Sequence, residues 1–349
     1  MRSSYTEDDV TLLLKDITGM VQPQPTEERE KLIQAGRHYS EMLPIEYVPT
    51  DKYMQVYEEA LKSYAKPVAR AIGVLADKVI ERKGKDTVLV SLARAGIPIG
   101  ILLKRYIRQK YSINMPHYSI SIIRGRGIDK NAMKYLLDRY KAEQLLFVDG
   151  WIGKGAIFNE LKKDIEEFDG VSAEIAVVAD PANITEMCGT HEDILIPSSC
   201  LNSTVSGLIS RTFLRDDIIG KEDFHGAVYY GELKENDLSY QFIEAIEKEF
   251  TMENDQEEND IEGVGIDEVR EIGRRYGIDD INLIKPGIGE ATRVLLRRIP
   301  WKVLIDERYK DDPQLAHLVR LAQEKNVPVE YYPMKHYKCC GMIKKMADT

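Results

Sequence analysis

The sequence predicts an α/β fold with a mostly parallel sheet flanked by helices and, after it, a small C-terminal α/β sandwich. From Thr87 onward, short apolar runs alternate with stretches of helical periodicity, which is typical of parallel sheets covered on both faces. Three glycine-rich loops follow predicted strands, and in open sheets ligands bind outside the carboxyl ends of the strands. An acidic stretch then precedes a second strand–helix alternation.

Composition and charge narrow the class of protein. The chain has 349 residues, 43% of them hydrophobic, and a net charge of −10, so it is long enough for two domains. It has no apolar run of membrane-spanning length and no secretory signal at its N-terminus, so we expect no membrane partner. The cysteine spacing is not that of a disulfide framework, which favours the reducing cytoplasm. The sequence leaves open whether the chain forms a homo-oligomer.

The N-terminal part is expected to be a helical cap. Apolar residues over 8–17 indicate a short amphipathic helix. A longer helix is predicted over 51–83, where Tyr57, Ala60, Leu61 and Tyr64 recur at helical spacing.

Alternating strands and helices are predicted to build the main sheet. The strands are expected over 88–92, 117–123, 145–148, 173–179 and 193–196. The helices between them are expected over 97–106, over 132–140 and through Leu161 and Ile165.

The acidic stretch divides the chain. Residues 253–271 hold nine acids and one arginine, a composition typical of solvated linkers. We therefore predict a domain over 1–252, a linker over 253–275 and a domain over 276–349. The last is expected to contain strands over 281–284, 302–305 and 327–332, a helix opening after Gly287 and a helix over 314–324.

The loop over 149–156 is the strongest candidate site. It follows an apolar strand, begins with an acid, and leads into a helix. Glycines there let backbone N–H groups converge at the helix N-terminus, where an anion is favoured. An ordinary strand–turn–helix corner is the alternative interpretation. The residues concerned are Asp149, Gly150, Gly153, Lys154, Gly155 and Ala156.

This loop resembles the phosphoribosyl-diphosphate (PRPP) loop of type I phosphoribosyltransferases. The resemblance implies that Asp149 binds the ribose and Mg²⁺, and that the glycine cradle with Lys154 binds the 5-phosphate. It differs from the family pattern because Gly150 stands where a second acid is usual. It also lacks the usual cradle threonines, whose donors Lys154 could replace with charge.

Two further loops fit the same resemblance. The loop over 91–96 resembles the diphosphate-binding loop of that family, which implies that Arg94 contacts the diphosphate and that Ser91, Ala95 and Gly96 line the site. The loop over 124–129 falls where the family has a mobile hood, which implies that Arg124 or Arg126 closes over the ligand.

Longer stretches resemble a bacterial family associated with tellurite-resistance stress operons. They cover residues 121–129, 148–157 and 199–212. The family is described both as a divergent phosphoribosyltransferase and as the cysteine protease StiP family, which are incompatible mechanisms.

Under the protease description, Cys200 is the candidate nucleophile and His225 its base, with Asp223 or Asn202 available to orient the histidine. A buried, inert cysteine is the alternative interpretation of Cys200. We prefer PRPP-dependent glycosyl transfer with Mg²⁺, because it gives the glycine loops and arginines a use. A non-catalytic nucleotide sensor that binds RNA is a third hypothesis.

The segment after Cys200 has two interpretations. Residues 202–206 and Arg211 could line the acceptor side of a transferase site. Alternatively, Asn202 or Ser203 simply caps a helix that runs through Leu208.

The C-terminal part resembles the Pelota/L7Ae RNA-binding fold. Its Gly-Ile-Gly-Glu-Ala-Thr-Arg over 287–293 parallels a Gly-x-Asn-Glu-x-x-Lys signature, and Val-Pro-Val over 327–329 parallels a later strand. The resemblance implies a structured RNA partner, with arginines on phosphates and an acid on a base edge. The expected contacts are Gly289, Glu290, Arg293, Arg297, Arg298 and Lys335.

Overall fold

The main sheet is mostly parallel, as predicted. The computed structural model describes residues 1–254 and 261–344. In the first of these ranges, a seven-stranded sheet has the order β1-β4-β3-β6-β7-β8, with β5 beside β4. Pairings along this order are parallel, and β5 runs antiparallel to β4. The strands are β1 (Thr11–Leu12), β3 (Val88–Ala93), β4 (His117–Ile123), β5 (Gly127–Ile128), β6 (Leu145–Trp151), β7 (Ile175–Ala179) and β8 (Cys188–Thr190).

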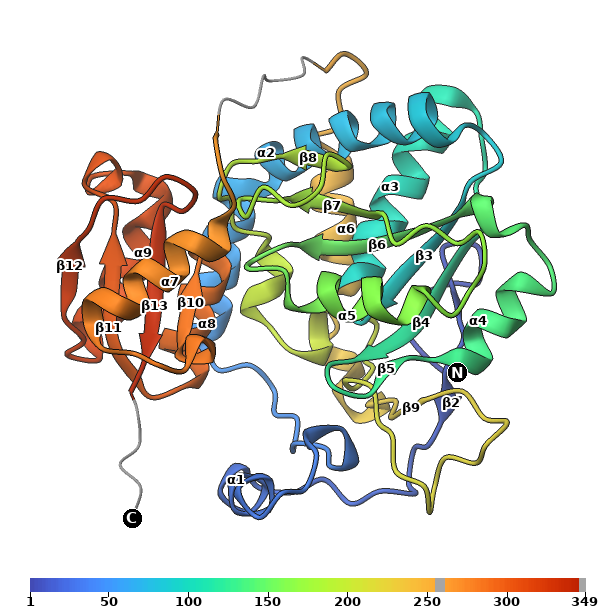
Figure 1. The fold of residues 1–349 in the computed structure, drawn as a ribbon, viewed down its shortest axis with the longest axis horizontal. Helices are drawn as coiled ribbons and strands as arrows, with labels where there is room; N and C mark the ends of the chain where they lie inside the picture. The colour runs from blue at the N-terminus through green and yellow to red at the C-terminus, as the bar shows by residue number, and fades with distance from the viewer. Residues whose placement is uncertain (255–260, 345–349) are drawn as a thin grey trace.

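Helices cover both faces of this sheet (Figure 1). On β6, Leu146 and Val148 pack with α2, α3 and α6, whereas Leu145 and Phe147 pack with α4 and α5. Successive strand side chains point to opposite faces, so the apolar run of β6 is buried on both sides. The helices are α2 (Asp51–Lys83), α3 (Gly96–Tyr111), α4 (Lys130–Leu137), α5 (Ala156–Ile165) and α6 (Ser239–Glu247).

The N-terminal segment is extended, so the helix predicted over 8–17 is wrong. It contains β1 and β2 (Lys15–Asp16), and β2 pairs with β9 (Gly226–Ala227). Val10 and Leu14 are buried in one apolar cluster, whereas Leu13 belongs to another. An extended chain can bury neighbouring residues in different cores, and this tertiary burial overrides the local helical pattern. Helix α1 (Thr26–Gln34) follows.

The C-terminal domain has a four-stranded sheet of order β10-β13-β11-β12 within residues 261–344. Helix α7 packs on one face of the sheet, and α8 and α9 pack on the other. The central strand β13 was not predicted. The elements are α7 (Gly265–Tyr276), β10 (Ile284–Pro286), α8 (Ile288–Arg297), β11 (Pro300–Ile305), α9 (Ala316–Glu324), β12 (Val329–Tyr331) and β13 (Cys339–Ile343).

Two predicted elements have other structures. The range 193–196 forms no strand, and β8 takes the edge position instead. The range 281–284 is mostly a 3₁₀ helix. The 3₁₀ helices of the described residues are η1 (Tyr39–Glu41), η2 (Ala142–Gln144), η3 (Pro197–Cys200), η4 (Ser203–Val205), η5 (Gly231–Asn236), η6 (Ile281–Leu283), η7 (Glu307–Tyr309) and η8 (Pro313–Leu315).

The two domains share one continuous apolar core. Ile288 and Leu295 of α8 belong to the same buried cluster as Leu195 and Cys200 of the main domain. Part of the predicted linker, 255–260, lies outside the described residues. The part after residue 264 is helix α7, whose Val269 packs in the core of the C-terminal domain. The acidic composition therefore hides an amphipathic helix, whose apolar residues decide its structure.

Candidate functional site

The three glycine-rich loops meet, as expected, because β4, β3 and β6 are neighbours in the sheet. Gly96 brings two of them into contact. A Cβ at Gly96 would lie 2.4 Å from the carbonyl oxygen of Val148, so only glycine allows α3 to begin against β6. The Ala93–Arg94 peptide bond in the same loop is cis. The loops after β3 and β6 consequently form one surface at the carboxyl end of the sheet.

Asp149 lies on this surface at the carboxyl end of β6. Protein surrounds its side chain although a small part remains accessible, and its Oδ1 accepts a hydrogen bond from Gly150 N at 2.7 Å. Burial raises the pKa of Asp149 to about 7, and the Gly150 hydrogen bond opposes this only in part. Because the pKa of this carboxyl group lies near neutral pH, a nearby cation would readily favour loss of its proton.

The predicted phosphate cradle is used for domain docking. Lys154 Nζ donates to the carbonyl oxygens of Ile281 and Ile284, the latter at 3.0 Å. Tyr337 Oη donates to Gly153 O at 2.7 Å. Burial, and after it the positive charge of Lys285, together lower the pKa of Lys154 to about 8. Helix α5 begins at Ala156 after Gly155, so the loop has the predicted local structure. Its contact with the C-terminal domain was not predicted.

The diphosphate-loop residues also have protein partners. Arg94 Nη1 donates to Ile209 O at 2.6 Å, and its Nη2 lies 3.6 Å from Glu46 Oε1. Ser91 Oγ is buried 2.6 Å from His117 Nε2 and is directed into the core. Ser91 can therefore contribute only backbone atoms to a ligand site, whereas Arg94 lies at its edge.

The predicted hood is a turn between β4 and β5 that the N-terminal segment supports. Arg126 forms an ion pair with Glu41 of η1. His38 Nε2 lies 3.2 Å from the carbonyl oxygen of Arg124, whose own side chain is exposed. These partners could not be predicted from the sequence, since neither His38 nor Glu41 belongs to a recognisable motif.

The predicted RNA-binding helix α8 docks against the main domain. Gly287, which precedes it, has φ +89°, and a Cβ there would lie 3.1 Å from Asp193 Oδ1. Asp193 accepts hydrogen bonds from Ile288 N at 3.0 Å and Lys338 N at 2.9 Å. Arg297 Nη2 donates to Leu201 O at 2.6 Å. Asp193 thus supplies from the other domain the acceptor that α8 lacks at its own N-terminus.

The other predicted RNA contacts lie in two places. Gly289 and Glu290 line a narrow crevice that also borders Gly153 and Ser199. Glu290 pairs with Arg293 at 3.2 Å. Arg298 is exposed beyond the end of α8, whereas Lys335 lies elsewhere, in a pocket of the C-terminal domain.

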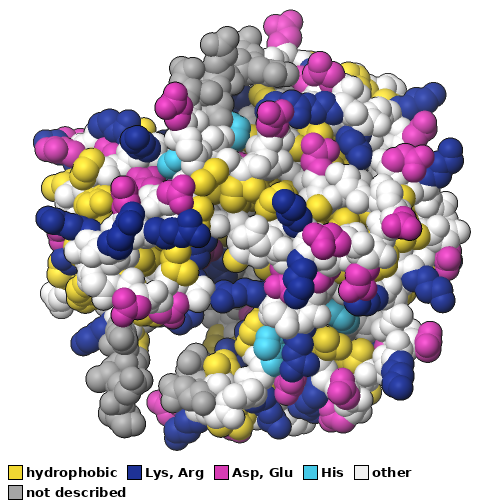
Figure 2. Space-filling model, in the orientation of Figure 1, with side chains coloured by type: hydrophobic (Ala, Val, Ile, Leu, Met, Phe, Trp, Pro, Cys, Tyr) yellow, Lys and Arg dark blue, Asp and Glu magenta, His cyan; other side chains and the backbone are white. Residues whose placement is uncertain are grey.

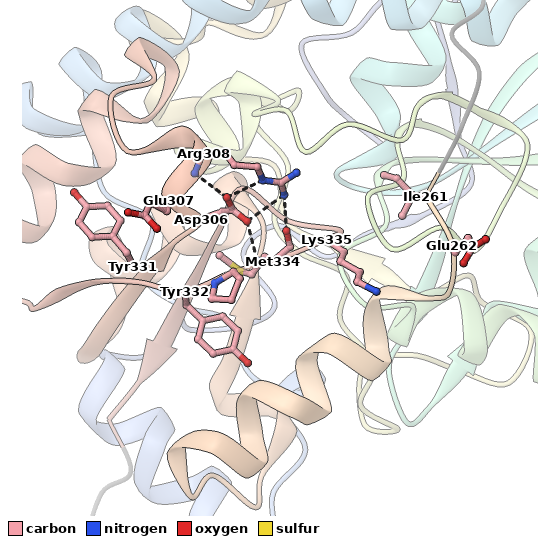
Figure 3. Close-up of a pocket in the computed structure, with 10 residues that line it drawn as sticks. Ile261, Glu262, Asp306, Glu307, Arg308, Tyr331, Tyr332, Met334 and Lys335 are labelled. Carbon is pink, nitrogen blue, oxygen red and sulfur yellow. Dashed lines mark hydrogen bonds and ion pairs between the residues drawn. The ribbon is translucent and has the colours of Figure 1, made fainter.

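That pocket has a volume of about 680 Å³ (Figure 3). Asp306 lies in it and is satisfied internally, because it pairs with Arg308 at 2.9 Å and accepts from Met334 N at 2.7 Å. Glu262 and Glu307 add negative charge beside Lys335. Its mixed charges do not favour a polyanion.

Cys200 and His225 have separate environments. Cys200 is fully buried, and burial raises its thiol pKa to about 12. His225 Nδ1 lies 2.8 Å from Ser121 Oγ, and its backbone N donates to Asp129 Oδ2 at 2.6 Å. In the described part of the chain no hydrogen bond links Cys200 to His225. The predicted orienting acid, Asp223, pairs with Lys15 instead.

The segment after Cys200 is a short helix start. Asn202 Oδ1 accepts from Thr204 N at 3.2 Å and so caps η4. Arg211 Nη2 donates to the carbonyl oxygens of Tyr39 and Met42 at 2.9 and 3.0 Å. The capping interpretation of Asn202 is therefore confirmed, although η4 ends at Val205 rather than continuing through Leu208.

A different cysteine–histidine pair occurs at the sheet edge. Cys188 Sγ of β8 lies 3.3 Å from His191 Nε2, and His191 Nδ1 lies 3.0 Å from Asp180 O. The carboxyl group of Asp180 is fully buried, its Oδ1 has no hydrogen-bond partner in the described residues, and its charge adds to the burial that raises the pKa of the Cys188 thiol. No motif in the sequence predicted this cluster. The three-residue spacing of Cys188 and His191 was its only signal, and that is weak.

The fold and these sites define an α/β enzyme scaffold with a docked second domain. The chain belongs to the StiP family, described as tellurite-like stress resistance cysteine proteases, which matches residues 3–247. Residues 263–345 match the PELOTA RNA binding domain. The cysteine protease StiP of Acinetobacter baylyi is 35% identical over 365 residues, covering 98% of this chain and 94% of that protein.

Solved phosphoribosyltransferases are more distant. A hypoxanthine-guanine phosphoribosyltransferase of Bacillus anthracis is 15% identical and covers 38% of this chain and 71% of its own, with a TM-score of 0.23. A purine phosphoribosyltransferase of Pyrococcus horikoshii is 20% identical, covering 32% and 73% with the same TM-score. At such scores the likeness says nothing about activity. Among the described residues, no helix is long and apolar enough to span a membrane.

Proposed function

We propose that this chain is a cysteine peptidase whose nucleophile is Cys188 and whose general base is His191. The family description and the name of the Acinetobacter baylyi relative support the reaction class. The observation that carries the assignment of residues is the 3.3 Å contact between Cys188 Sγ and His191 Nε2. A nucleophile beside a base that a third group orients is the arrangement such chemistry needs, and the Asp180 carbonyl orients His191.

The pair would act from a neutral resting state. Burial raises the pKa of the Cys188 thiol to about 12, so the sulfur carries its proton at neutral pH. In the proposed reaction, His191 Nε2 takes this proton as Sγ bonds to the substrate carbonyl carbon. The proton then passes to the leaving amine as the C–N bond breaks, and water hydrolyses the thioester to restore the thiol.

Access to Cys188 requires a local opening. The side chain is fully buried, and α2 packs closely on β8 because a Cβ at Gly189 would lie 2.1 Å from Ala71 O. Asn183 Nδ2, in the loop after Asp180, donates to Ile261 O at 3.0 Å and Gly263 O at 2.9 Å. A peptide substrate would therefore reach the pair only when β8 separates from α2 or the loop after Asp180 separates from residues 261–263.

The test is hydrolysis of a fluorescent casein by the full chain, by two single variants and by the double variant that combines them. Cys188→Ala should abolish turnover, whereas Cys200→Ala should retain it. The opposite pattern would make Cys200 the nucleophile. Normal turnover by the double variant would contradict cysteine chemistry altogether. Circular dichroism of each variant checks that the loss is not one of folding.

A second candidate function is the binding of PRPP or a related ribose phosphate with Mg²⁺ for glycosyl transfer. The observation that favours it is Asp149, which lies at the carboxyl end of β6, where Gly96 brings the loop after β3 against it, and whose carboxyl pKa is raised by burial to about 7. No group of three or more Asp, Glu, His or Cys side chains among the described residues could hold a metal by itself. One carboxylate nevertheless suits Mg²⁺ that arrives on phosphate groups, because this ion keeps waters and phosphates as ligands.

In that function the ion would neutralise charge on the leaving diphosphate. Asp149 would hold it and the ribose hydroxyls, while Arg94 and Arg124 would contact phosphates at the rim. Titration calorimetry of the full chain with PRPP and Mg²⁺ should then show binding that Asp149→Asn removes. An absence of heat with the wild-type chain, after a positive control with a known PRPP enzyme, would eliminate this candidate.

RNA is the partner that we propose for the C-terminal domain, on the strength of its match to an RNA binding domain. All four cysteines are free in the structure, which supports our proposal of a reducing cytoplasm as the location.

A further inference from the structure

Cations of both domains converge on the cleft between them. Arg124 and Lys154 come from the main domain, and Lys285, Arg293 and Arg298 from the C-terminal domain. Lys285 is partly buried, and in the described parts of the chain its Nζ has neither a hydrogen bond nor an ion pair. Burial lowers its pKa, and Arg298, Arg124 and Arg293 lower it further, whereas Glu290 opposes them. Lys154 Nζ donates to the carbonyl oxygen of Ile284, the residue before Lys285, and Gly153 borders the same crevice as Glu290, so cations of the two domains lie on either side of this contact.

A second group of arginines continues this positive surface. Arg297 is exposed along part of its side chain while its Nη2 is bonded to Leu201 O, and desolvation, followed by Arg293 and Arg94, lowers its pKa to about 10. The pKa of Arg211 is also lowered to about 10, first by burial and then by Arg29 and Arg94. The Nε atoms of Arg211 and Arg29 are buried without acceptors among the described residues.

Few acids balance these charges. Glu290 pairs with Arg293 at 3.2 Å, and Glu46 lies 3.6 Å from Arg94. Of the acids near the hood turn, Glu41 is held by Arg126, and Glu160 accepts from Gly125 N. Figure 2 shows Lys and Arg side chains gathered around a hollow between the C-terminal domain and the main domain. An excess of unpaired cations destabilises a protein by itself, so a bound polyanion would stabilise this arrangement.

We propose that the cleft is a composite RNA site in which one phosphate backbone is held by cations of both domains. The proposal rests on RNA being the partner of the C-terminal domain. Helix α8 is not free for RNA along its whole length, because Arg297 and the start of the helix are docked on the main domain. Lys285 and Arg298 of the C-terminal domain lie on the side of the cleft that faces Arg124 and Lys154 of the main domain. An RNA strand bound to the first two would therefore also contact the main domain.

The proposal assigns different roles to two predicted contacts. Arg298 belongs to the composite site. Lys335 does not, because it lies in the separate pocket with Glu262 and Glu307. In the same way, Arg124 belongs to the site, whereas Lys163, an exposed residue of α5, has no part in it.

Fluorescence anisotropy with a labelled RNA stem-loop and the full chain tests this assignment at several salt concentrations. Arg124→Gln and Arg298→Gln should each weaken binding and reduce the slope of log affinity against log salt by about 0.7–0.9, the value for one lost phosphate contact. The matched controls Lys163→Gln and Lys335→Gln should bind like the wild type. All four side chains lack structural partners in the described residues, so folding should be unaffected.

The outcomes separate the composite site from RNA binding itself. If Arg298→Gln weakens binding and Arg124→Gln does not, RNA contacts the C-terminal domain alone and the composite site is wrong. If wild-type protein binds no RNA, the RNA partner is wrong. If a DNA oligonucleotide of the same sequence competes equally well, the ligand is not specifically RNA and the assignment to RNA fails.

Discussion

The interdomain cleft and the Cys188–His191 cluster differ in almost every physical respect. The cleft lies between the two domains and is bordered by Lys and Arg side chains (Figure 2), and Asp149 belongs to the main domain at the carboxyl end of β6. The cysteine cluster is closed and built from β7, β8 and their connection, and its thiol is protonated. Each site contains what the other lacks. The cleft holds the cations of the proposed RNA site without an obvious nucleophile, and the cluster holds the proposed nucleophile and base without an open path.

This difference shows how one sheet can present two sorts of chemistry. The carboxyl ends of β3, β4 and β6 lie at the centre of the sheet, where loops converge and cations gather. Strand β8 lies at the edge, where the loop from β7 returns and places Cys188 beside His191. Experiments that disable one site at a time can therefore assign activity to either.

The largest expected effect is the loss of peptidase turnover when His191 is replaced, and His225 provides the comparison. His191→Ala should reduce turnover by about 10²–10⁴-fold, the usual contribution of a general base. His225→Ala should leave turnover of the folded fraction unchanged and lower stability, because it leaves Ser121 Oγ without its buried partner. Rates measured per folded molecule distinguish the two. Equal losses for both variants would contradict the assignment to His191.

Removal of the interdomain hydrogen bonds of Asp193 should have the next largest effect. Asp193→Ala leaves the N–H groups of Ile288 and Lys338 without their acceptor, which should destabilise the protein by about 2–4 kcal/mol. Asp193→Asn keeps one acceptor oxygen and should cost less. Urea denaturation measures both. Unchanged stability of Asp193→Ala would show that the domains are held by their apolar contact alone.

The pH dependence of Mg²⁺–PRPP binding should be smaller. Asp149 must lose its proton to bind a cation, and its pKa is about 7. Affinity should therefore rise as pH increases through 7, by about tenfold between pH 6 and pH 8. Calorimetry in buffers of different ionisation enthalpy should detect the released proton at pH 6. Affinity that falls with rising pH would exclude Asp149 as the metal ligand.

The smallest effect should come from the hood. Arg126→Gln breaks a solvent-accessible pair with Glu41, so stability should change by less than about 1 kcal/mol. If the hood closes over a ribose phosphate, the same variant should speed ligand dissociation in stopped-flow experiments. An unchanged dissociation rate would make the turn a purely structural connection.

Local pattern predicted the elements well where burial was uniform. The helix over 51–83 has the predicted bounds, and the strand over 117–123 does too. Prediction failed where neighbouring residues enter different cores, as at Leu13 and Leu14, and where an acidic stretch continues into a helix, as at the start of α7. For the site, the meeting of the three loops followed from parallel neighbouring strands. The partners of Lys154 and Arg94 did not, because they come from segments far away in the chain.

The sequence by itself determined the parallel sheet, the glycine loops, the position of Asp149 and the presence of a second α/β domain, because strand burial and turn chemistry are local properties. Only the tertiary structure decided which cysteine meets a histidine, and that α8 docks on the main domain through Asp193 and Arg297. Those contacts depend on the relative placement of whole elements, which is set by the shared core of the two domains rather than by any single motif.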